Sequence, residues 1–282
     1  MKPPPTTARS AGGKWLEPPP GPPWDEPIER AAMAFVDLEM TGLSTADRVI
    51  EICIDRVEGG VSERFSILVR PDDGTFGNEH VHGISLADLQ GAPLFADVAD
   101  RVANLLSGAA LIAHGATYDV AFLEAEFARA GRALRIPHFL DTLTLARRVY
   151  GFRSHALAAL AAAFELTPAR AHRAADDVHT LRAIFDRTVA QLRPRTLRDV
   201  WHVKVGAKSA RPQVLENLVT ACDQGIPVTV RYRPSGKPPT DYRMVVTKVR
   251  SELDPPQVLG YLLPGRGRRE LRADRILSVS FL

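Results

Sequence analysis

The hydrophobic pattern divides the chain into three kinds of segment. Residues 1–30 are rich in proline and show no regular apolar spacing, which favours polyproline II and predicts a disordered tail. From residue 31, short apolar runs alternate with apolar residues at helical spacing, as is typical of an α/β domain. Beyond residue 212 the apolar residues fall in short runs separated by turns, which predicts a small β domain.

The middle segment predicts a mixed sheet with flanking helices. Apolar runs at 34–36, 49–54 and 64–69 indicate three strands in a meander, with a Gly-Gly hairpin turn between the second and third. Helical spacing follows at 95–106, and a buried strand at 109–113 precedes a further helix. After 139–141 the chain reads as mostly helical to about residue 191, so we place this domain at 31–192.

The first strand ends in two carboxylates, Asp37 and Glu39, and Gly42 then turns the chain away. Side chains two apart on a strand point to the same face. The pair therefore offers oxygen ligands of the kind that Mg²⁺ prefers. A strand that merely runs into a polar turn would show the same residues, so a metal site requires more ligands from elsewhere.

Two later segments supply such ligands. Asp119 begins a helix that follows the strand at 109–113, where open α/β sheets place their sites, although the helix dipole also favours an acid there. Asp177 lies on the first turn of another helix, next to its apolar face, and His172 stands five residues earlier. A histidine near a helix start is often only a surface residue, but here it follows two acidic motifs.

These motifs, in this order, resemble those of the DEDDh 3′–5′ exonucleases, the DnaQ-like proofreading family with a ribonuclease-H-like fold. Asp37 and Glu39 match its first motif, Asp119 its second, and His172 with Asp177 its third. The segments 81–84 and 140–142 also look like parts of this family, and the resemblance covers about residues 31–192.

The resemblance implies a phosphodiester hydrolase that uses two divalent ions, Mg²⁺ or Mn²⁺. The four carboxylates would bind the metals and His172 would be the general base. The expected product is a nucleoside 5′-monophosphate. The resemblance also implies that the substrate's 3′ end is held by Thr41, Gly42, His82 and Tyr118.

Two departures bear on the substrate. Gly115 stands where the family usually has Asn after the His of the second motif. The first motif, 37–43, is similar to that of oligoribonucleases, which degrade very short RNA. We expect single-stranded DNA, as in proofreading or repair, with RNA or short oligonucleotides as the alternative. A nucleic-acid-binding or sensing protein with an inactive nuclease fold is a further alternative.

Charge is unevenly spread along the chain, whose formal net charge is +3. Residues 194–282 contain 16 Lys and Arg against 8 Asp and Glu, whereas residues 1–193 carry an acidic excess. A basic C-terminal part favours a polyanionic partner, although a solvated basic surface is the simpler interpretation.

The C-terminal part predicts a linker at 193–212 and a small Sm/SH3-like β-barrel domain at 213–282. Residues 260–262 and 271–276 resemble segments of a WYL domain, with Gly260 in place of its tryptophan. If the basic residues of this domain gather on one face, they would bind phosphates. The candidates are Arg243, Arg268, Arg269 and Arg272.

Nothing in the sequence has the length of a membrane span or the pattern of a secretory signal. Cys53 and Cys222 lie far apart in apolar surroundings, which is typical of buried thiols in a reducing compartment. We therefore expect a cytoplasmic protein without a membrane partner, which acts on nucleic-acid 3′ ends and has a DNA polymerase or repair complex as a candidate partner.

Overall fold

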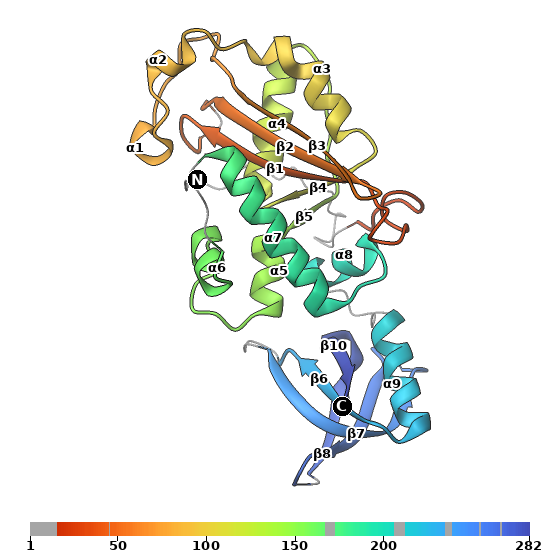
Figure 1. The fold of residues 1–282 in the computed structure, drawn as a ribbon. Coiled ribbons are helices and arrows are strands. Elements are labelled where there is room, and N and C mark those ends of the chain that lie inside the picture. Colours follow the sequence, from red (N-terminus) through yellow and green to blue (C-terminus); the bar gives the residue numbers. More distant parts are fainter. Residues whose placement is uncertain are drawn as a thin grey trace. The chain divides into compact units, whose positions relative to one another are not determined.

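The computed structural model describes residues 16–44, 46–166, 173–205, 212–234, 239–253, 255–265 and 267–282. The chain forms two compact units, Met1–Leu143 with Ser154–Asp186 and Thr144–Arg153 with Arg187–Leu282. Each unit contains a five-stranded sheet (Figure 1).

The first unit has the mixed sheet that the apolar pattern predicts. Its order is β3-β2-β1-β4-β5. Strands β1, β2 and β3 form an antiparallel meander, while β4 and β5 pair in parallel beside β1. The strands are β1 Met33–Met40, β2 Val49–Glu58, β3 Val61–Leu68, β4 Ala110–Ala113 and β5 Phe139–Asp141.

Helices cover both faces of this sheet (Figure 1). Helices α3 and α4 pack on one face, where Ala34, Val36 and Leu38 of β1 join the main apolar core. Helix α7 lies on the other face, and the ring of its Phe185 meets Phe35 edge-on with centroids 5.5 Å apart. The helices up to residue 192 are α1 Glu79–His82, α2 Leu86–Leu89, α3 Phe95–Leu106, α4 Thr117–Arg129, α5 Thr142–Val149, α6 Leu157–Ala163 and α7 Ala174–Leu192. Most of α5 and the end of α7 belong to the second unit.

The N-terminal segment differs from the tail predicted for residues 1–30. Residues 1–15 lie outside the described residues, but Trp24 and Ile28 are 4% and 6% exposed. Trp24 packs edge-on against His138, with ring centroids 6.3 Å apart. These two large apolar side chains anchor a segment whose many prolines alone predict disorder.

The second unit is an open antiparallel sheet with helices. Its order is β10-β6-β7-β8-β9, and the strand pairings of the described residues do not close it into the expected barrel. Helix α8 occupies part of the predicted linker, with Leu197, Val200 and Trp201 fully buried. The elements are α8 Leu197–Val205, α9 Pro212–Gln224, β6 Pro227–Tyr232, β7 Thr240–Arg250, β8 Gln257–Leu262, β9 Arg268–Arg272, the 3₁₀ turn Ala273–Arg275 and β10 Ile276–Phe281.

Gly260 of β8 shows why the WYL-like segment has no tryptophan here. A Cβ at this position would lie 2.2 Å from the carbonyl oxygen of Val245 and 2.6 Å from the terminal methyl of Met244. The strand therefore has no room for any larger side chain at residue 260. The WYL assignment itself stays a prediction.

None of the helices within the described ranges is long and apolar enough to cross a membrane.

Candidate active site of the first unit

Strand β1 places Asp37 and Glu39 on the face that α7 covers. Asp37 is opposite Cys53 and Glu39 is opposite Glu51 in the antiparallel pairing with β2. The intervening Leu38 belongs to the core under α3 and α4. The alternation along one strand thus separates acidic from apolar positions, as the D-x-E spacing predicts. The register shifts between Glu39 and Met40, the last residue of β1.

Three of the predicted metal ligands come together. Carboxylate oxygens of Asp37, Glu39 and Asp177 all lie within 4.8 Å of one another. Asp177 is on the first turn of α7, so its position depends on how that helix begins. These three groups have the chemistry of a divalent cation site, because hard cations prefer carboxylate oxygens.

Asp119 belongs to the same neighbourhood but not to that tight group. It lies on the first turn of α4 and is 6% exposed. Its charge is the largest electrostatic contribution from another acid to the raised pKa of Asp37. Asp119 thus approaches the site from the α4 side, as its position after a parallel strand predicts.

The acids of this cluster hold protons unusually tightly. Burial, followed by the charges of Asp119 and Asp177, raises the pKa of Asp37 well above its ordinary value. Burial and then the charge of Asp177 raise the pKa of Glu39 to about 7. Burial is also the first cause for Asp119, whose pKa is raised to about 7. Buried like charges that resist ionisation fit a cation site, since a cation between them relieves both penalties.

His172, the predicted general base, lies outside the described residues. Its neighbour Arg173 is described and forms an ion pair with Glu51, with Nη2 and Oε1 2.9 Å apart. No sequence pattern predicted a role for Glu51 or Arg173. A glutamate inside the apolar run 49–54 looks like an ordinary strand residue until the β1–β2 register is known.

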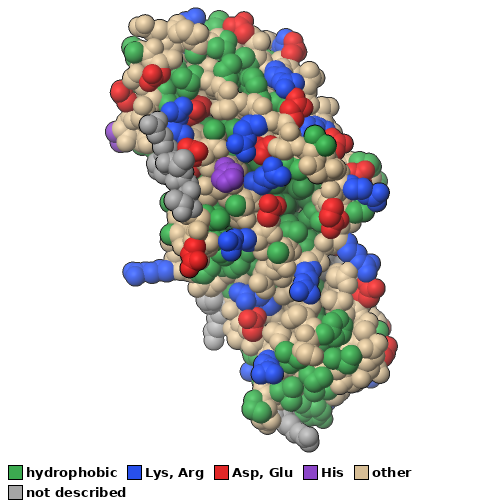
Figure 2. Space-filling model, viewed as in Figure 1, with side chains coloured by type: hydrophobic (Ala, Val, Ile, Leu, Met, Phe, Trp, Pro, Cys, Tyr) green, Lys and Arg blue, Asp and Glu red, His purple; other side chains and the backbone are tan. Residues whose placement is uncertain are grey.

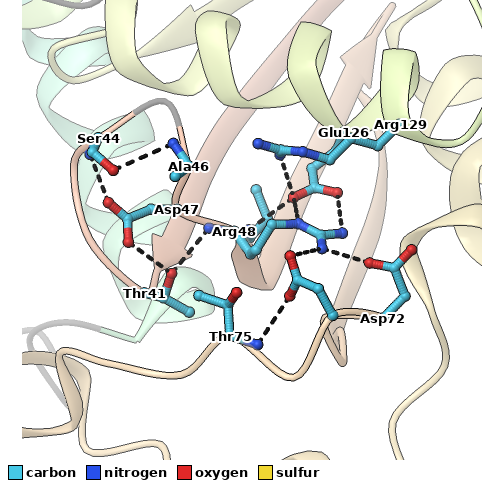
Figure 3. A network of polar contacts seen from close by, with 11 residues as sticks. Thr41, Ser44, Ala46, Asp47, Arg48, Asp72, Thr75, Glu126 and Arg129 are labelled. Carbon is cyan, nitrogen blue, oxygen red and sulfur yellow. Dashed lines mark hydrogen bonds and ion pairs between the residues drawn. The ribbon is translucent and has the colours of Figure 1, made fainter.

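The loop after the D-x-E pair is held by its own polar residues (Figure 3). The Thr41 hydroxyl donates to Asp47 at 3.2 Å and accepts the backbone N–H of Arg48 at 2.9 Å. A Cβ on Gly42 would lie 2.5 Å from the Asp47 carboxylate, so a larger residue there would displace that side chain. The Thr41 hydroxyl is therefore engaged within the loop, and the roles of Thr41 and Gly42 in substrate binding stay predictions.

A buried ion pair fastens this loop to α4 (Figure 3). Arg48 is 4% exposed and donates through Nε and Nη2 to the carboxylate of Glu126, at 2.8 and 3.0 Å. Asp72 and Asp73 also pair with Arg48, and Arg129 pairs with Glu126. Arg48 and Glu126 are 78 residues apart in the sequence, so no local sequence pattern could have predicted their ion pair.

His82, predicted to contact substrate, is instead built into its own turn. It is 4% exposed. Its Nδ1 accepts the N–H of Ile84 at 3.0 Å, so its Nε2 carries the proton and donates to the carbonyl of Gly77 at 3.0 Å. Both ring nitrogens of His82 are thus engaged within the 77–84 loop, and its role in substrate binding stays a prediction. Tyr118, on the first turn of α4, is half-buried and stays a prediction.

Gly115 adopts a left-handed backbone, with φ of +84°. Its N–H donates to Asp141 at 2.9 Å, and the charge of Asp141 contributes to the raised pKa of Asp119. Nε2 of the preceding His114 donates to the carbonyl of His155 at 2.9 Å. The change from Asn to Gly thus falls at a backbone conformation that glycine readily adopts.

The four C-terminal arginines do not all share one face. By the β7–β8–β9 register Arg243 and Arg268 lie on the same side of the sheet, whereas Arg269 lies over the ring of Tyr242 on the other. Arg272 is paired with Asp274. On the face drawn in Figure 2, basic and acidic side chains are interspersed over the molecule.

Comparison with known proteins assigns the family. The model of the exonuclease family RNase_T matches residues 34–185, more than half of the chain, and its range includes every predicted catalytic position. The chain therefore belongs to this exonuclease family, as the order of its motifs predicts.

Two relatives show how the match extends. The chain is 29% identical over 202 residues to DNA polymerase III subunit epsilon of Treponema pallidum, covering 70% of this chain and 94% of that protein. It is 33% identical over 171 residues to the 3′-5′ exonuclease DinG of Bacillus subtilis. That match covers 59% of this chain but only 18% of DinG, so the chain spans less than a fifth of that relative.

Solved structures show the same fold. Exonuclease I matches with a TM-score of 0.55 at 16% identity, covering 89% of this chain and 64% of that one. The nuclease domain of 3′hExo, described as a DEDDh family member, matches with a TM-score of 0.50 at 16% identity, covering 56% and 92%. The expected ribonuclease-H-like α/β architecture of the first unit is thereby confirmed.

Proposed function

We propose that the protein is a metal-dependent 3′–5′ exonuclease that removes nucleoside 5′-monophosphates from single-stranded 3′ ends, with DNA preferred. The observation that carries the proposal is the group of Asp37, Glu39 and Asp177, whose carboxylate oxygens lie within 4.8 Å. The preference for DNA rests on the relatives, which include a DNA polymerase III subunit.

The acidic cluster fits divalent cations. Asp37, Glu39 and Asp177 would hold them, with Asp119 beside Asp37 completing the set. Mg²⁺ or Mn²⁺ suits a site made of carboxylates, and two ions would match four such groups. When bound, the cations neutralise phosphate charge and make water a stronger acid.

The proton of the attacking water goes to His172 in this proposal, because a neutral imidazole accepts a proton near neutral pH. The water oxygen bonds to the phosphorus of the terminal nucleotide. The bond from that phosphorus to the 3′ oxygen of the preceding nucleotide breaks, and this oxygen leaves as a 3′ hydroxyl after taking a proton from solvent. The terminal nucleotide departs as its 5′-monophosphate.

The shape of the site supports action at a chain end. In the loop after β1 the Asp47 carboxylate accepts the N–H of Ser44 at 2.7 Å, and the N–H of Arg48 donates to the Thr41 hydroxyl at 2.9 Å, close in the chain to Glu39. We propose that this backbone and the half-buried Tyr118 bind the terminal nucleotide. Preorganised backbone groups lower the entropy that binding costs.

Digestion of 5′-labelled oligonucleotides tests the function. Wild-type protein with Mg²⁺ should shorten single-stranded DNA stepwise from the 3′ end, more slowly shorten RNA of the same sequence, and spare DNA with a blocked 3′ end. Asp37→Asn should abolish the shortening. Binding without cleavage under these conditions would contradict the proposal and favour a non-catalytic nucleic-acid-binding protein, and faster cleavage of RNA would contradict the DNA preference.

For the second unit we propose a weaker, supporting role in phosphate binding by Arg243 and Arg268, which are exposed and share one side of its sheet. Replacing both by Glu should reduce the salt dependence of DNA binding by about one unit of slope for each lost phosphate contact. Arg269→Glu, a charge reversal at an exposed residue on the other side of the sheet, is the control. An unchanged slope in the double variant would remove this role.

The relatives also make a DNA polymerase a candidate partner, because one of them is a polymerase III subunit. Copurification of the tagged chain with a polymerase subunit tests this partnership, and its absence from purified polymerase complexes would contradict it.

A further inference from the structure

Strand β2 sends two buried carboxylates toward α7, and each pairs with an arginine. Glu51 is 3% exposed and pairs with Arg173, immediately before the helix. Asp55 is fully buried and pairs with Arg182, within the helix, at 3.0 Å. Both ion pairs join β2 to α7 or the residue just before it, but only the Glu51–Arg173 pair lies beside the acidic cluster.

Glu51 binds more than the arginine. One of its oxygens accepts from Nη2 of Arg173 at 2.9 Å, and Nε of Arg173 lies 3.2 and 3.3 Å from the two oxygens. The second oxygen also accepts the backbone N–H of Ala174, the first residue of α7, at 3.1 Å. One carboxylate therefore satisfies a free N–H at the start of the helix and fixes the side chain next to it.

The position of this contact relates it to the site. Glu51 is directly opposite Glu39 in the β1–β2 register. Asp177 follows Ala174 by three residues on the first turn of α7, and His172 directly precedes Arg173 in the chain. Glu51 thus ties the strand pair that carries the D-x-E motif to the helix turn that carries the third carboxylate.

We propose that the Glu51–Arg173 pair is a positioning element of the active site. It sets the start of α7 so that Asp177 meets Asp37 and Glu39. The inference builds on the proposed function for its catalytic consequence, but its consequence for cation binding can be measured independently of any cleavage.

The sign of the effect separates positioning from simple charge balance. Arg173→Gln removes a positive charge from the edge of an acidic cluster. In a titration at a pH above about 7, where the acids of the cluster are ionised, loss of an arginine that acts only through its charge would make the cluster more negative and would tighten divalent cation binding. If Arg173 positions Asp177, the affinity for the cation falls in Arg173→Gln. The reason is that less ordered ligands lose more conformational entropy when they bind the ion.

The chain offers a matched control. The side chains of Arg173 and Arg182 are 34% and 33% exposed, and each pairs with a buried carboxylate of β2. Arg182→Gln therefore removes an ion pair between the same two elements without touching the first turn of α7, although Asp55 keeps a second pair with Arg64 at 3.2 Å. Any loss due only to weaker packing of α7 on the sheet should appear in both variants.

The test is a calorimetric titration of Mn²⁺ into the full-length variants, with kcat and KM measured in parallel on single-stranded DNA. Arg173→Gln should lower Mn²⁺ affinity and kcat by about 10- to 100-fold, the usual cost of losing a partner behind a metal ligand. KM should change less, and Arg182→Gln should keep wild-type affinity and kcat at temperatures where both variants are folded.

If Arg173→Gln does not fold, variants of Glu51 test the same ion pair from its other side. Glu51→Gln retains an oxygen that can accept the N–H of Ala174 and should lose less affinity than Glu51→Ala. Equal Mn²⁺ affinity in the Arg173 and Arg182 variants, or tighter binding in Arg173→Gln, would overturn the inference. Wild-type protein that binds Mn²⁺ but cleaves no nucleic acid would contradict the proposed function and leave the affinity comparison valid.

Discussion

The two faces of the first sheet use the same strands for opposite purposes. On the face under α3 and α4, Ala34, Val36 and Leu38 pack into a continuous apolar core. On the face under α7, the alternate positions of β1 are Phe35, Asp37 and Glu39, and those of β2 include Glu51 and Asp55. One face stabilises the fold, whereas the other carries buried acids that oppose folding unless they are paired, protonated or bound to cations.

Because side chains alternate between the two faces of a strand, one set of β1 residues can stabilise the fold while the other set carries the acidic site. Because the apolar face supplies burial on its own, substitutions of unpaired acids on the polar face should change activity without weakening the fold. Substitutions on the apolar face should do the reverse.

The largest effect is expected for Asp37→Asn. It removes a charge from the centre of the cluster and should lower kcat by about 10³-fold or more, since cations contribute several kcal/mol to such reactions. In metal-free buffer the same change should leave the melting temperature equal or higher, because burial and then the charges of Asp119 and Asp177 disfavour a carboxylate at this position and not an amide. A clear fall in melting temperature would show that the two faces are not separable.

His172→Ala should lower kcat by about 10²- to 10⁴-fold, the range for losing a general base. His179, exposed on α7, provides a control, and His179→Ala should keep wild-type activity. Single-turnover rates on labelled DNA check both variants. Full activity in His172→Ala would assign the proton transfer to another group.

On the apolar face, Leu105→Ala should lower the free energy of unfolding by about 2–5 kcal/mol, because it opens a cavity in a close-packed core. Leu105 is 2% exposed and lies on α3, which carries none of the site residues. Denaturant unfolding measures the loss. Activity well below the melting temperature should equal that of wild type, and a proportionate loss of kcat would contradict the separation.

The smallest effect concerns pH. The pKa values of Glu39 and Asp119 are each raised from their ordinary values of about 4 to about 7, so the folded state binds more protons than the unfolded state between these limits. The stability that this contributes is full below about pH 4 and is lost as pH rises to about 7. With EDTA present, the melting temperature should therefore fall between about pH 5 and about pH 7 and change little above about pH 8.

Added Mg²⁺ should raise the melting temperature more at the higher pH, because the ionised carboxylates bind it better. Glu39→Gln should show a smaller fall with pH than wild type. A melting temperature that rises with pH equally in both proteins would contradict this assignment.

Much of the fold and of the acidic cluster was predictable because short-range patterns encode them. The alternation at residues 34–39 predicts both faces of β1, and a strand followed by a helix-start acid predicts the place of Asp119. Glu51 escaped prediction because its partner Arg173 is 122 residues away. Arg48 and Glu126 escaped for the same reason, since only tertiary structure brings such distant side chains together.

The ends of the folded segments were harder to predict from the sequence than the acidic cluster. Residues 193–212 have little apolar periodicity, yet α8 forms there and buries Leu197, Val200 and Trp201. Tertiary packing can stabilise a short helix whose own sequence predicts none. In the N-terminal segment, likewise, the burial of Trp24 outweighs a proline content that favours disorder.

The central claim is that the polar face of this sheet is a cation site and the apolar face is not needed for it. Calorimetric titration of Mn²⁺ into wild type, Asp37→Asn and Leu105→Ala tests it directly. We predict that wild type and Leu105→Ala bind with the same affinity and that Asp37→Asn shows no binding in the same range. Equal affinity in wild type and Asp37→Asn would contradict the account.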